Sequence, residues 1–562
     1  MINKDSEFLP AGFILLRKRM GLSFRKKDDY LIRKFLLVSF VVFLQFLFCN
    51  EGLCRDWYVR PADAPGEEGD GTSTMRSWKG FRNIVWGDKG TREGDTLYLL
   101  PGIYHEQLRI EGSGKVDNPV QIRCVAGGEC IIDSGRKFRY LIYAKDVQHV
   151  VLSELTTRNA ASAGIWFTGE CTGITVKNCR SYHNKNYGIY FGNNKGTMRT
   201  IRIEGNDTFN NGQDDWGAGI FLRAAKQGLI EDVEIVKNDC YDNIGRYGIG
   251  VYPNKGGQVC RIEVHGNTCY RNGRTGIEFS HNVTDSSIHN NNCHHNGNTY
   301  PGAGIHVGGV KDASCSRIRI YSNECSHQFH QRKDGPGILV DDYTSHIEVS
   351  RNKTHQNEEA GIKLHNCSDV TVFSNVILDN MTGIKTPSAR RYAIYNNNIL
   401  RCPKYGVHIM RQPENVLLAN NIIGMCLQTG IKYNGASRMN TNEKRNCFFA
   451  NTQDVITDTE GNSSSKDGII GAPSFVNLER EDFRLVDGSP CLNSGIVVPN
   501  LIGFYGKELD DKAEPNIGVY QGIGVPNAVK KLRLSSGSSR LETGLNLKSD
   551  VSFSLYPVTP TI

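Results

Sequence analysis

The chain has 562 residues, with 66 lysines and arginines against 59 aspartates and glutamates, which gives a net charge of +7. Residues 1–54 contain nine of the basic and five of the acidic residues, so the rest of the chain carries only about +3. This balance does not indicate a nucleic-acid-binding protein, which usually shows a basic stripe. The small net positive charge is compatible with a local basic patch that faces an acidic polysaccharide.

The N-terminal segment has the pattern of a secretory signal peptide. Residues 25–34 (RKKDDYLIRK) are charged and net basic, and residues 35–48 (FLLVSFVVFLQFLF) are an apolar run of 14. A run of this length is too short for an ordinary membrane span. We therefore expect residues 1–54 to be removed. The remaining chain should be secreted, periplasmic or on the cell surface, without a membrane span, and monomeric.

Residues 55–135 are predicted to form an N-terminal capping region and the first strands. The segment 77–88 (SWKGFRNIVWGD) carries four apolar side chains at helical spacing, Trp78, Phe81, Ile84 and Val85. This pattern predicts an amphipathic piece that plugs the first coil. Cys124 and Cys130 are close enough in sequence to form a disulfide in an oxidising compartment.

A strand that opens with Gly-Ile or Gly-Val then returns eleven times. The copies are AGIWF (163–167), YGIYF (187–191), AGIFL (218–222), YGIGV (247–251), TGIEF (275–279), AGIHV (303–307), PGILV (336–340), AGIKL (360–364), TGIKT (382–386), YGVHI (405–409) and TGIKY (429–433). Their glycines are 22 to 33 residues apart. A period of this length indicates a solenoid, propeller or array, and a unit so short and β-rich predicts one coil of a β-solenoid.

Each coil is expected to have three strands. A second apolar strand follows the Gly-Ile strand and ends at Asn, as in IEVHGN (262–267), and a third short strand and a polar loop complete the coil. The fold class predicted for residues 136–450 is therefore all-β, a right-handed parallel β-helix of about eleven or more coils. The residues expected to stack inside one turn are Asn178, Asn206, Asn238, Asn267, Asn323, Asn352 and Asn375, because stacked amides hydrogen-bond along such an axis.

Four cysteines each lie two residues past an Asn of this kind, namely Cys240, Cys269, Cys293 and Cys325. We expect an interior stack of small apolar side chains there. A metal site is the alternative, but no paired Cys or Cys/His spacing supports it. Residues 451–522 are predicted to be a C-terminal region associated with the β-helix, and residues 523–562 a tail that is disordered or an attachment segment.

The Gly-Ile and Asn coil resembles the right-handed parallel β-helix repeats of the pectin-lyase-like superfamily, as found in carbohydrate-binding proteins and sugar hydrolases. The opening GDTLYLLPGIYHEQLRI (94–110) and the ending DFRLVDGSPCLNSG (482–495) resemble the flanks of secreted bacterial members. The resemblance covers roughly residues 55–522. The WIDH, DPHD and NTD/GHG/RIK signatures of enzymes in this superfamily are missing, so the resemblance implies a glycan partner more strongly than a reaction.

Side chains alternate along a strand, so the residues two and four after each glycine should point outward. The outward stripe begins with aromatic residues, including Trp166 and Tyr190, continues with Glu278 and His306, and ends with lysines. The coils between residues 188 and 337 are the longest. We expect their loops to form the sides of a functional groove beside Glu278, since long loops on a rigid scaffold often carry function.

The predicted catalytic residues are Arg223, Glu278, His306 and Lys363. Cleavage of a uronate polymer by β-elimination needs a charge that neutralises the carboxylate and a base that takes the C5 proton. Arg223 suits the first task because its planar fork binds carboxylates. His306, His365 or Lys363 is the candidate base, and Tyr252 a candidate proton donor. An epimerase would use nearly the same set.

The candidate metal ligands are Asp341 and Asp342, with Glu278 near them, and Ca²⁺ is the candidate ion because it takes several oxygen ligands. The predicted substrate-binding residues are Trp166, Tyr190, Trp216, Tyr252 and His365. A hydrolase would instead need two carboxylates, which Asp214 or Asp215 with Glu278 or Asp341 could supply.

The sequence therefore predicts a secreted β-helix protein that acts on or binds an acidic polysaccharide, with a polysaccharide lyase or epimerase as the leading hypothesis. The alternative is a non-catalytic carbohydrate-binding or cell-surface scaffold protein.

Overall fold

The computed structural model describes residues 54–526, except 214–215, 255, 330–333, 412, 459–460, 464, 466 and 510–511. Residues 1–53 of the predicted signal segment 1–54, the carboxylates Asp214 and Asp215, and residues 527–562 of the predicted tail lie outside the described residues. Among the described residues, no helix is both long and apolar enough to cross a membrane.

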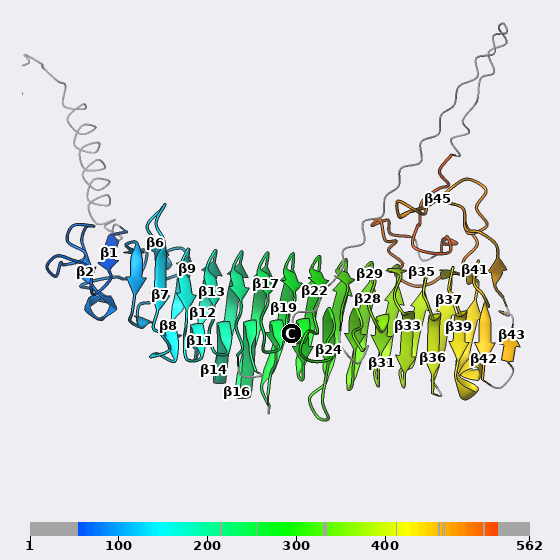
Figure 1. The fold of residues 1–562 in the computed structure, drawn as a ribbon, viewed down its shortest axis with the longest axis horizontal. Coiled ribbons are helices and arrows are strands. Elements are labelled where there is room, and N and C mark those ends of the chain that lie inside the picture. The colour runs from blue at the N-terminus through cyan, green and yellow to red at the C-terminus, as the bar shows by residue number, and fades with distance from the viewer. Residues whose placement is uncertain are drawn as a thin grey trace, which may run out of the picture.

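The chain is wound into a rod of stacked coils, in which three parallel sheets run along the axis (Figure 1). The all-β parallel β-helix expected from the repeat is confirmed, and the eleven Gly-Ile strands pair in sequence order in one sheet. That first sheet contains β5 (Leu108–Ile110), β8 (Tyr140–Lys145), β11 (Ala163–Thr168), β14 (Tyr187–Glu204), β16 (Ala218–Val236), β18 (Tyr247–Val251), β21 (Thr275–Ser280), β24 (Ile305–Gly308), β27 (Ile338–Val340), β30 (Ala360–Leu364), β33 (Thr382–Pro387), β36 (Tyr405–Met410), β39 (Thr429–Tyr433) and β42 (Val455–Thr457).

The second sheet begins nearer the N-terminus, and β14 and β16 are long enough to run through both sheets. Its other strands are β1 (Asp56–Arg60), β3 (Thr96–Leu99), β6 (Val120–Cys124), β9 (Gln148–Ser153), β12 (Thr172–Lys177), β19 (Gln258–His265), β22 (Val283–His289), β25 (Cys315–Tyr321), β28 (Thr344–Ser350), β31 (Ser368–Phe373), β34 (Arg390–Tyr395), β37 (Val416–Ala419) and β40 (Thr441–Lys444).

The third sheet has 15 short strands in sequence order. They are β4 (Gly102–Tyr104), β7 (Cys130–Asp133), β10 (Thr156–Arg158), β13 (Arg180–Tyr182), β15 (Asp207–Phe209), β17 (Asp239–Tyr241), β20 (Thr268–Tyr270), β23 (Asn292–His294), β26 (Glu324–Ser326), β29 (Lys353–His355), β32 (Val376–Leu378), β35 (Asn398–Leu400), β38 (Ile422–Gly424), β41 (Cys447–Phe449) and β44 (Ile469–Ile470).

The repeated glycine is required by close packing between coils. A Cβ atom on Gly276 would lie 2.6 Å from the carbonyl oxygen of Gly304 in the next coil, and Gly248 and Gly304 face the same contact at 2.7 Å. Real Cβ atoms do not approach a carbonyl oxygen so closely. The Ile that follows each glycine points into the rod and is fully buried, as at Ile277 and Ile305.

An internal asparagine ladder is confirmed, with side-chain amides joined along the axis at 2.9–3.0 Å. Its described members are Asn206, Asn238, Asn267, Asn291, Asn323, Asn352, Asn375, Asn397, Asn421 and Asn446. The prediction was wrong for Asn178, which is exposed with a φ of 53°. Cys179 takes the ladder position instead, and its amide donates to Asn206 Oδ1 at 2.9 Å.

A second amide ladder lies at the corner before the Gly-Ile strand and was not predicted. Its side chains are buried and bonded coil to coil. The members are Asn184, Asn211, Asn243, Asn272, Asn296, Gln328, Asn357 and Asn380. The predicted stack of Cys240, Cys269, Cys293 and Cys325 is fully buried as expected, and Cys124 is disulfide-bonded to Cys130.

The two ends of the rod are closed in different ways. At the first coil, Trp78, Phe81 and Ile84 are buried as a plug, but the helical spacing was misleading. The segment forms the short strand β2 (Trp78–Lys79) and a 3₁₀ turn, η1 (Phe81–Asn83), rather than an α-helix. At the other end, β43 (Gly461–Ser463) pairs antiparallel with β42 and interrupts the parallel order.

The C-terminal region packs against the side of the rod beside the third sheet (Figure 1). It contains the hairpin β45 (Phe475–Asn477) and β46 (Asp482–Leu485). Phe483 and Leu485 join a buried cluster with Leu378 and Leu400 of the coils. Asn396 Nδ2 donates to the carbonyl oxygen of Asn516 at 2.7 Å, so polar contacts fix this region as well.

Candidate functional site

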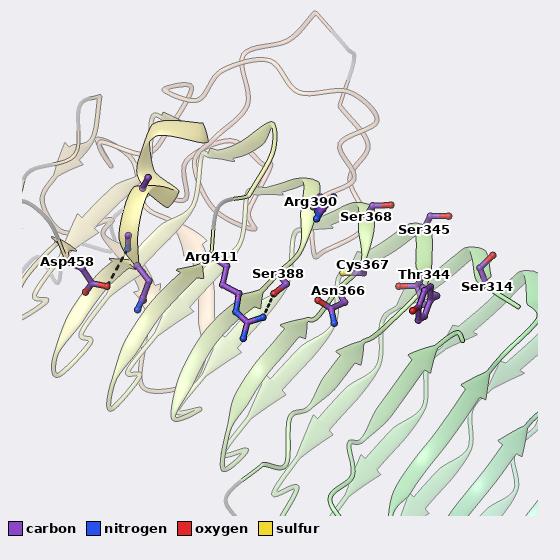
Figure 2. Close-up of a pocket in the computed structure, with 14 residues that line it drawn as sticks. Ser314, Thr344, Ser345, Asn366, Cys367, Ser368, Ser388, Arg390, Arg411 and Asp458 are labelled. Carbon is purple, nitrogen blue, oxygen red and sulfur yellow. Dashed lines mark hydrogen bonds between the residues drawn. The ribbon is translucent and has the colours of Figure 1, made fainter. Parts of the chain in front are cut away.

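A groove runs along the turns that connect the first sheet to the second (Figure 2). It has a volume of about 1170 Å³, and its walls come from successive coils between Ser314 and Asp458. Two arginines on neighbouring coils, Arg390 and Arg411, line it. Arg411 Nη1 donates to Ser388 Oγ at 3.1 Å, while Arg390 is 3.7 Å from Glu414 in an exposed ion pair. The groove is thus polar, with cationic groups available to an anionic ligand.

Two buried side chains, Glu278 and His306, and the half-buried Asp341 form a line of alternating charge next to this groove. His306 Nδ1 is 2.9 Å from Glu278 Oε2, and His306 Nε2 is 3.3 Å from Asp341 Oδ2. Glu278 on β21 and His306 on β24 are paired across the sheet, and both point outward because Ile277 and Phe279 fill the interior. Glu278 is only 1% exposed and His306 only 6%. They are therefore not the freely solvated side chains that an outward strand position would ordinarily give.

Gly308 makes room for this contact. A Cβ atom there would lie 2.8 Å from His306 Nε2 and 3.3 Å from Asp341 Cβ. The absence of a side chain at this position lets the imidazole lean toward the aspartate of the following coil. We call Glu278, His306 and Asp341 the charge relay below.

The relay fixes the protonation of its members. Burial alone would lower the pKa of His306, but the carboxylates of Glu278 and Asp341 outweigh burial and raise that pKa to about 9. Burial would raise the pKa of Glu278, yet His306 and Arg274 hold it below its usual value. Burial also opposes ionisation of Asp341, and the two histidines lower its pKa in spite of it. At neutral pH His306 is thus an imidazolium between two carboxylates.

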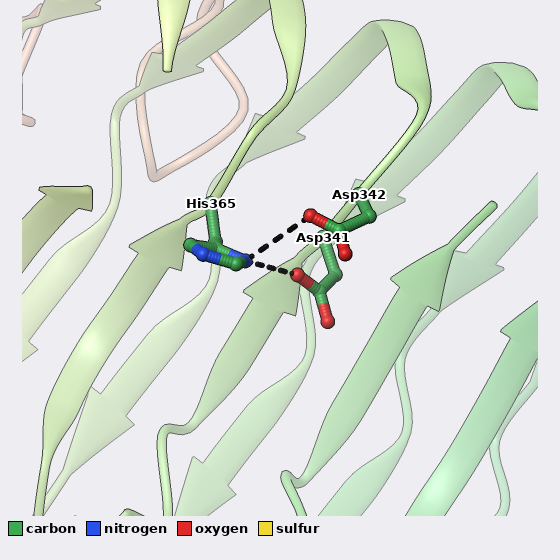
Figure 3. Close-up of side chains that lie close together, drawn as sticks. All are labelled: Asp341, Asp342 and His365. Carbon is green, nitrogen blue, oxygen red and sulfur yellow. Dashed lines mark hydrogen bonds and ion pairs between the residues drawn. The ribbon is translucent and has the colours of Figure 1, made fainter. Parts of the chain in front are cut away.

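Asp341 extends the line toward the groove, where it meets His365 and Asp342 (Figure 3). His365 Nδ1 is 2.6 Å from Asp341 Oδ1 and 3.4 Å from Asp342 Oδ1. The His365 side chain keeps 35% of its surface exposed. Asn366, the next residue, lines the groove and donates to Asp342 at 2.7 Å. A carboxylate beside Nδ1 favours the tautomer that carries its proton on that nitrogen, and in this tautomer Nε2 is an acceptor.

The three ligand atoms of Asp341, Asp342 and His365 all lie within 4.8 Å of one another, the spacing of a metal site. The donor set consists of two carboxylates and one imidazole. Ca²⁺ prefers oxygen ligands, whereas imidazole suits transition ions, so this mixed set fits a borderline ion such as Mn²⁺ or Zn²⁺ better than Ca²⁺. Glu278, which the sequence placed near such a site, is instead bonded to His306.

Lys363 lies on the same outward column but makes different contacts. Its ammonium is 2.8 Å from Glu359 Oε1, which Lys385 of the next coil also contacts at 2.8 Å. Two cations on one buried carboxylate leave a net positive charge on this part of the face. These surroundings suit recognition of an anion better than removal of a proton.

The aromatic part of the stripe is packed rather than open. Trp166 stacks between Tyr140 and Tyr190, with ring centroids 4.2 and 3.6 Å away. The expectation that Tyr190 is exposed was wrong, because it is 6% exposed within a cluster that also contains Phe221 and Tyr247. Equivalent positions on successive coils are about 4.8 Å apart, so outward rings stack on each other and cover their own faces.

Trp216 and Tyr252 form a second group closer to the relay. Their rings lie edge to face at 5.9 Å, and Trp216 is 42% exposed. The guanidinium of Arg246 lies 4.0 Å from the Trp216 ring centroid, a cation–π contact that covers one face of the indole. Tyr252 also packs on His281 at 4.2 Å.

The structure therefore brings Glu278, His306, Asp341, Asp342 and His365 into one continuous chain of contacts. Burial raises the pKa of Tyr190, and Arg223 offsets only part of this rise, so Arg223 lies beside the aromatic cluster instead. The sequence analysis missed three cations, Arg274, Arg390 and Arg411. Arg274 directly precedes β21, four positions before Glu278, and this short separation was the available signal. The groove arginines carry no such signal, since Arg390 begins β34 and Arg411 follows β36, both outside the Gly-Ile strands.

Comparison with known families matches residues 124–231 and 218–392 to the right handed beta helix region. Residues 314–473 match the periplasmic copper-binding protein family NosD. No curated protein matches the sequence of the chain.

Solved structures with a similar backbone include pectate lyase Pel9A, at 14% identity and a TM-score of 0.37, covering 84% of this chain and 97% of that one. XylC in complex with xylose is 10% identical with a TM-score of 0.42, covering 84% and 99%. The periplasmic alginate epimerase AlgG is 13% identical with a TM-score of 0.37, covering 66% and 76%. The family matches and the observed coils agree on a right-handed β-helix.

Proposed function

We propose that this right-handed β-helix protein, with its pectin-lyase-like fold, is exported and binds an acidic polysaccharide in the groove beside Asp341 and His365, where it acts as a lyase or epimerase. The observation that carries the proposal is the Asp341–His365 pair, with a 2.6 Å contact, next to a groove lined by Arg390 and Arg411. Export is supported by the signal-like segment 1–54 and by the periplasmic description of the family that matches residues 314–473.

The first requirement of β-elimination or epimerisation is a base for the C5 proton of a uronate. We assign this role to His365 Nε2. Asp341 accepts a hydrogen bond from the Nδ1–H and orients the ring, as a carboxylate does for a catalytic imidazole. The His306 imidazolium in turn keeps Asp341 ionised. His306 itself is protonated and enclosed, so it positions the pair rather than acting as the base.

The second requirement is positive charge at the uronate carboxylate, because abstraction of the C5 proton builds negative charge there. Arg390 and Arg411 in the groove, and Lys363 and Lys385 on the adjoining face, supply it. Arginine forks bind carboxylates in a bidentate manner and fix their orientation. Tyr343, which lines the groove and is 53% exposed, is the candidate proton donor, to the leaving O4 oxygen as the C4–O4 bond breaks in a lyase, or to C5 in an epimerase.

A divalent cation is an alternative source of this charge. Asp341, Asp342 and His365 would hold it, its chemistry would be neutralisation of the substrate carboxylate, and His365 would then be a ligand and not the base. The Ca²⁺ expected from the sequence and Mn²⁺ are both tested in the experiment below.

The deciding experiment incubates the purified protein with a panel of uronate polymers. Absorbance of the unsaturated product reports a lyase, and the ratio of sugar epimers by NMR reports an epimerase. Each polymer is run with Ca²⁺, with Mn²⁺ and with a chelator. The variants are His365→Gln and Asp341→Asn, and the matched control is His265→Gln, an imidazole bonded to Glu234 on the second sheet.

We expect His365→Gln to abolish turnover while polymer binding is retained, and His265→Gln to behave as wild type. Binding of a polymer by wild type without turnover under any condition would favour the non-catalytic carbohydrate-binding scaffold. Failure to bind any acidic polymer would overturn both the lyase or epimerase proposal and the scaffold alternative.

A further inference from the structure

Two cysteines meet where the C-terminal region packs on the rod. Cys447 begins β41, and Cys491 lies in the C-terminal region after β46. Both side chains are fully buried, and both belong to the apolar cluster that joins Phe483 and Leu485 to the coils. Neither cysteine belongs to the candidate site, and the proposed chemistry does not use them.

Cys447 faces the C-terminal region rather than the interior of the rod. Side chains alternate along β41, and Phe448, the next residue, is part of the core inside the coils. Cys447 instead shares the outer cluster with Ile422, its partner on the preceding coil. Its thiol donates to the carbonyl oxygen of Gly471 at 3.4 Å, in the segment that leads into the hairpin of β45 and β46.

The same segment brings Cys491 to this place. Ser489 Oγ donates to the carbonyl oxygen of Pro473, two residues after Gly471. The same hydroxyl accepts from the Cys491 amide at 3.2 Å. One carbonyl of the segment 471–473 thus contacts Cys447, and another holds Cys491 through the Ser489 hydroxyl.

The two thiols also contact each other directly. A hydrogen bond with the Cys447 thiol, together with burial, raises the pKa of the Cys491 thiol. Two cysteines can be bridged without backbone movement only when their side chains point toward each other. The contacts of the segment 471–473 and the bond between the thiols indicate that this pair meets that condition.

The place of the pair in the fold decides whether an oxidant can reach it. Cys402 and Cys426 also share a thiol hydrogen bond, but both lie in the core inside the coils. An oxidant reaches them only if coils separate. Cys447 and Cys491 lie between two parts of the molecule, so they are accessible until the C-terminal region has packed on the rod, and again whenever it opens locally.

We propose that Cys447 and Cys491 are a site of oxidative cross-linking, at which a disulfide bond links the C-terminal region to the rod. The proposal rests on the export proposed above, because disulfides form and persist in oxidising compartments. The oxidant is an external disulfide, that of glutathione or of a thiol oxidoreductase. Cys124 and Cys130 already form a bond of this kind near the N-terminal end of the rod.

The chemistry consists of two successive thiol–disulfide exchanges. The thiolate of one cysteine attacks the external disulfide, forms a mixed disulfide and releases one external thiolate. The thiolate of the other cysteine attacks the cysteine sulfur of the mixed disulfide, forms the Cys447–Cys491 bond and releases the second external thiolate. The cysteines lose two protons and two electrons, and the external disulfide becomes two thiols. Because the new bond joins distant parts of the chain, it should restrict detachment of the C-terminal region.

The first test uses wild-type protein that has been purified in the reduced state and incubated with oxidised glutathione. Free thiols are blocked with N-ethylmaleimide in denaturant, and tryptic peptides are analysed by mass spectrometry without reduction. Trypsin places the two cysteines in separate peptides, 446–466 and 485–507. We expect these peptides to be joined, with a mass two hydrogens below their sum. Two blocked thiols, or glutathione adducts without the joined peptides, would overturn the proposal.

The second test asks whether the bond holds the two parts together. Arg480 is exposed and lies between the two cysteines in sequence, so limited trypsin digestion can cut the folded chain there. The oxidised wild type should then migrate as one band on a non-reducing denaturing gel and as two fragments after dithiothreitol is added. Separation of the wild-type fragments without reductant would contradict the cross-link.

Two variants complete the second test. Cys491→Ser should release the fragments without reductant. The matched control is Cys402→Ser, which removes one thiol of the interior pair and should behave as wild type. Release of the fragments from Cys402→Ser but not from Cys491→Ser would assign the cross-link to other cysteines and overturn the proposal.

The result is separate from that of the polysaccharide assay. A cross-linked protein that binds no acidic polymer would support the disulfide and overturn the proposed action on a polysaccharide. A protein that turns over a uronate polymer but keeps both thiols would do the reverse.

Discussion

At the residue scale, the decisive arrangement is the burial of His306 between Glu278 and Asp341. Each of these groups is costly to bury alone, and each is stabilised by its neighbour at 2.9 or 3.3 Å. Removing one partner leaves an uncompensated buried charge. The enclosure of these charges makes the relay a specific feature of three successive coils, since an ordinary outward strand position would be solvated.

The raised pKa of His306 predicts how stability depends on pH. Its folded pKa is about 9 against an unperturbed 6.5, so this group stabilises the fold fully below about 6.5, and the stabilisation is lost as pH rises through about 9. We expect the free energy of unfolding of wild type to fall over this range. His306→Gln should be less stable at pH 6 and should show a smaller fall, as measured by urea unfolding at several pH values. Parallel curves for the two proteins would contradict the assignment.

The two groove arginines give a prediction about binding. Arg390→Gln with Arg411→Gln should weaken retention of a uronate polymer and reduce its dependence on salt, because two cations that face the ligand are lost. Affinity electrophoresis at low and moderate salt measures both effects. The control is Arg261→Gln, whose guanidinium is paired with Glu231 and Asp232 on the second sheet. Equal weakening in the control would point to general charge rather than the groove.

At the element scale, each coil is held to the next by side-chain amides as well as by strand hydrogen bonds. Asn267 Nδ2 donates to Asn291 Oδ1 and to the carbonyl oxygen of Ile235, both at 2.9 Å, and its own Oδ1 accepts from Asn238. Two such ladders, one at each of two corners, make register between coils unambiguous. The glycine at the second corner allows the close approach, because a Cβ atom would meet a carbonyl oxygen of the next coil.

The ladder predicts a contrast between two asparagines that look alike in sequence. Asn267→Ala should lower the free energy of unfolding by about 1–3 kcal/mol, because buried partners lose their hydrogen bonds. Asn178→Gly should change it little, since Asn178 is exposed and glycine accepts its φ of 53°. Chemical denaturation of both variants measures the difference. A similar loss in both would mean that the ladder contributes nothing beyond the backbone.

At the scale of the whole molecule, each coil of the rod contacts mainly the adjacent coils. The C-terminal region packs on the side of the later coils (Figure 1). In such a repeat architecture, each coil depends mainly on the coils beside it. The apolar cluster of Phe483, Leu485, Leu378 and Leu400 is one of two apolar contacts between the two parts. Loss of this contact should therefore leave the relay coils intact.

Phe483→Ala tests this independence. Removing a buried phenylalanine costs about 3–5 kcal/mol, and here the loss should fall on the attachment of the C-terminal region. We expect limited proteolysis to cut between residues 471 and 526 faster than in wild type, while the fragment upstream stays folded. The matched control is Phe504→Ala, a partly buried neighbour of the same cluster, which should have a smaller effect. Simultaneous unfolding of the coils would show that the region is part of one cooperative unit.

The periodic residues determined the fold by themselves. Gly-Ile at fixed intervals, alternating apolar residues and Asn at the end of the second strand are local requirements of every coil, so they are repeated in the sequence and can be read from it. The wrong prediction that Asn178 belongs to the ladder also arose from a local requirement. Asn also suits a left-handed corner, and only the register of the coils shows that Cys179 holds the ladder position.

The site depended on tertiary structure because its residues do not repeat. The sequence identified Glu278, His306 and Asp341 as outward, but only stacking of the coils shows that they touch and are enclosed. Stacking also buries Tyr190 against its neighbours and brings Arg390 and Arg411 from two successive coils into one groove. Contacts between coils join residues more than 20 positions apart, and no local pattern encodes which loop covers an outward side chain.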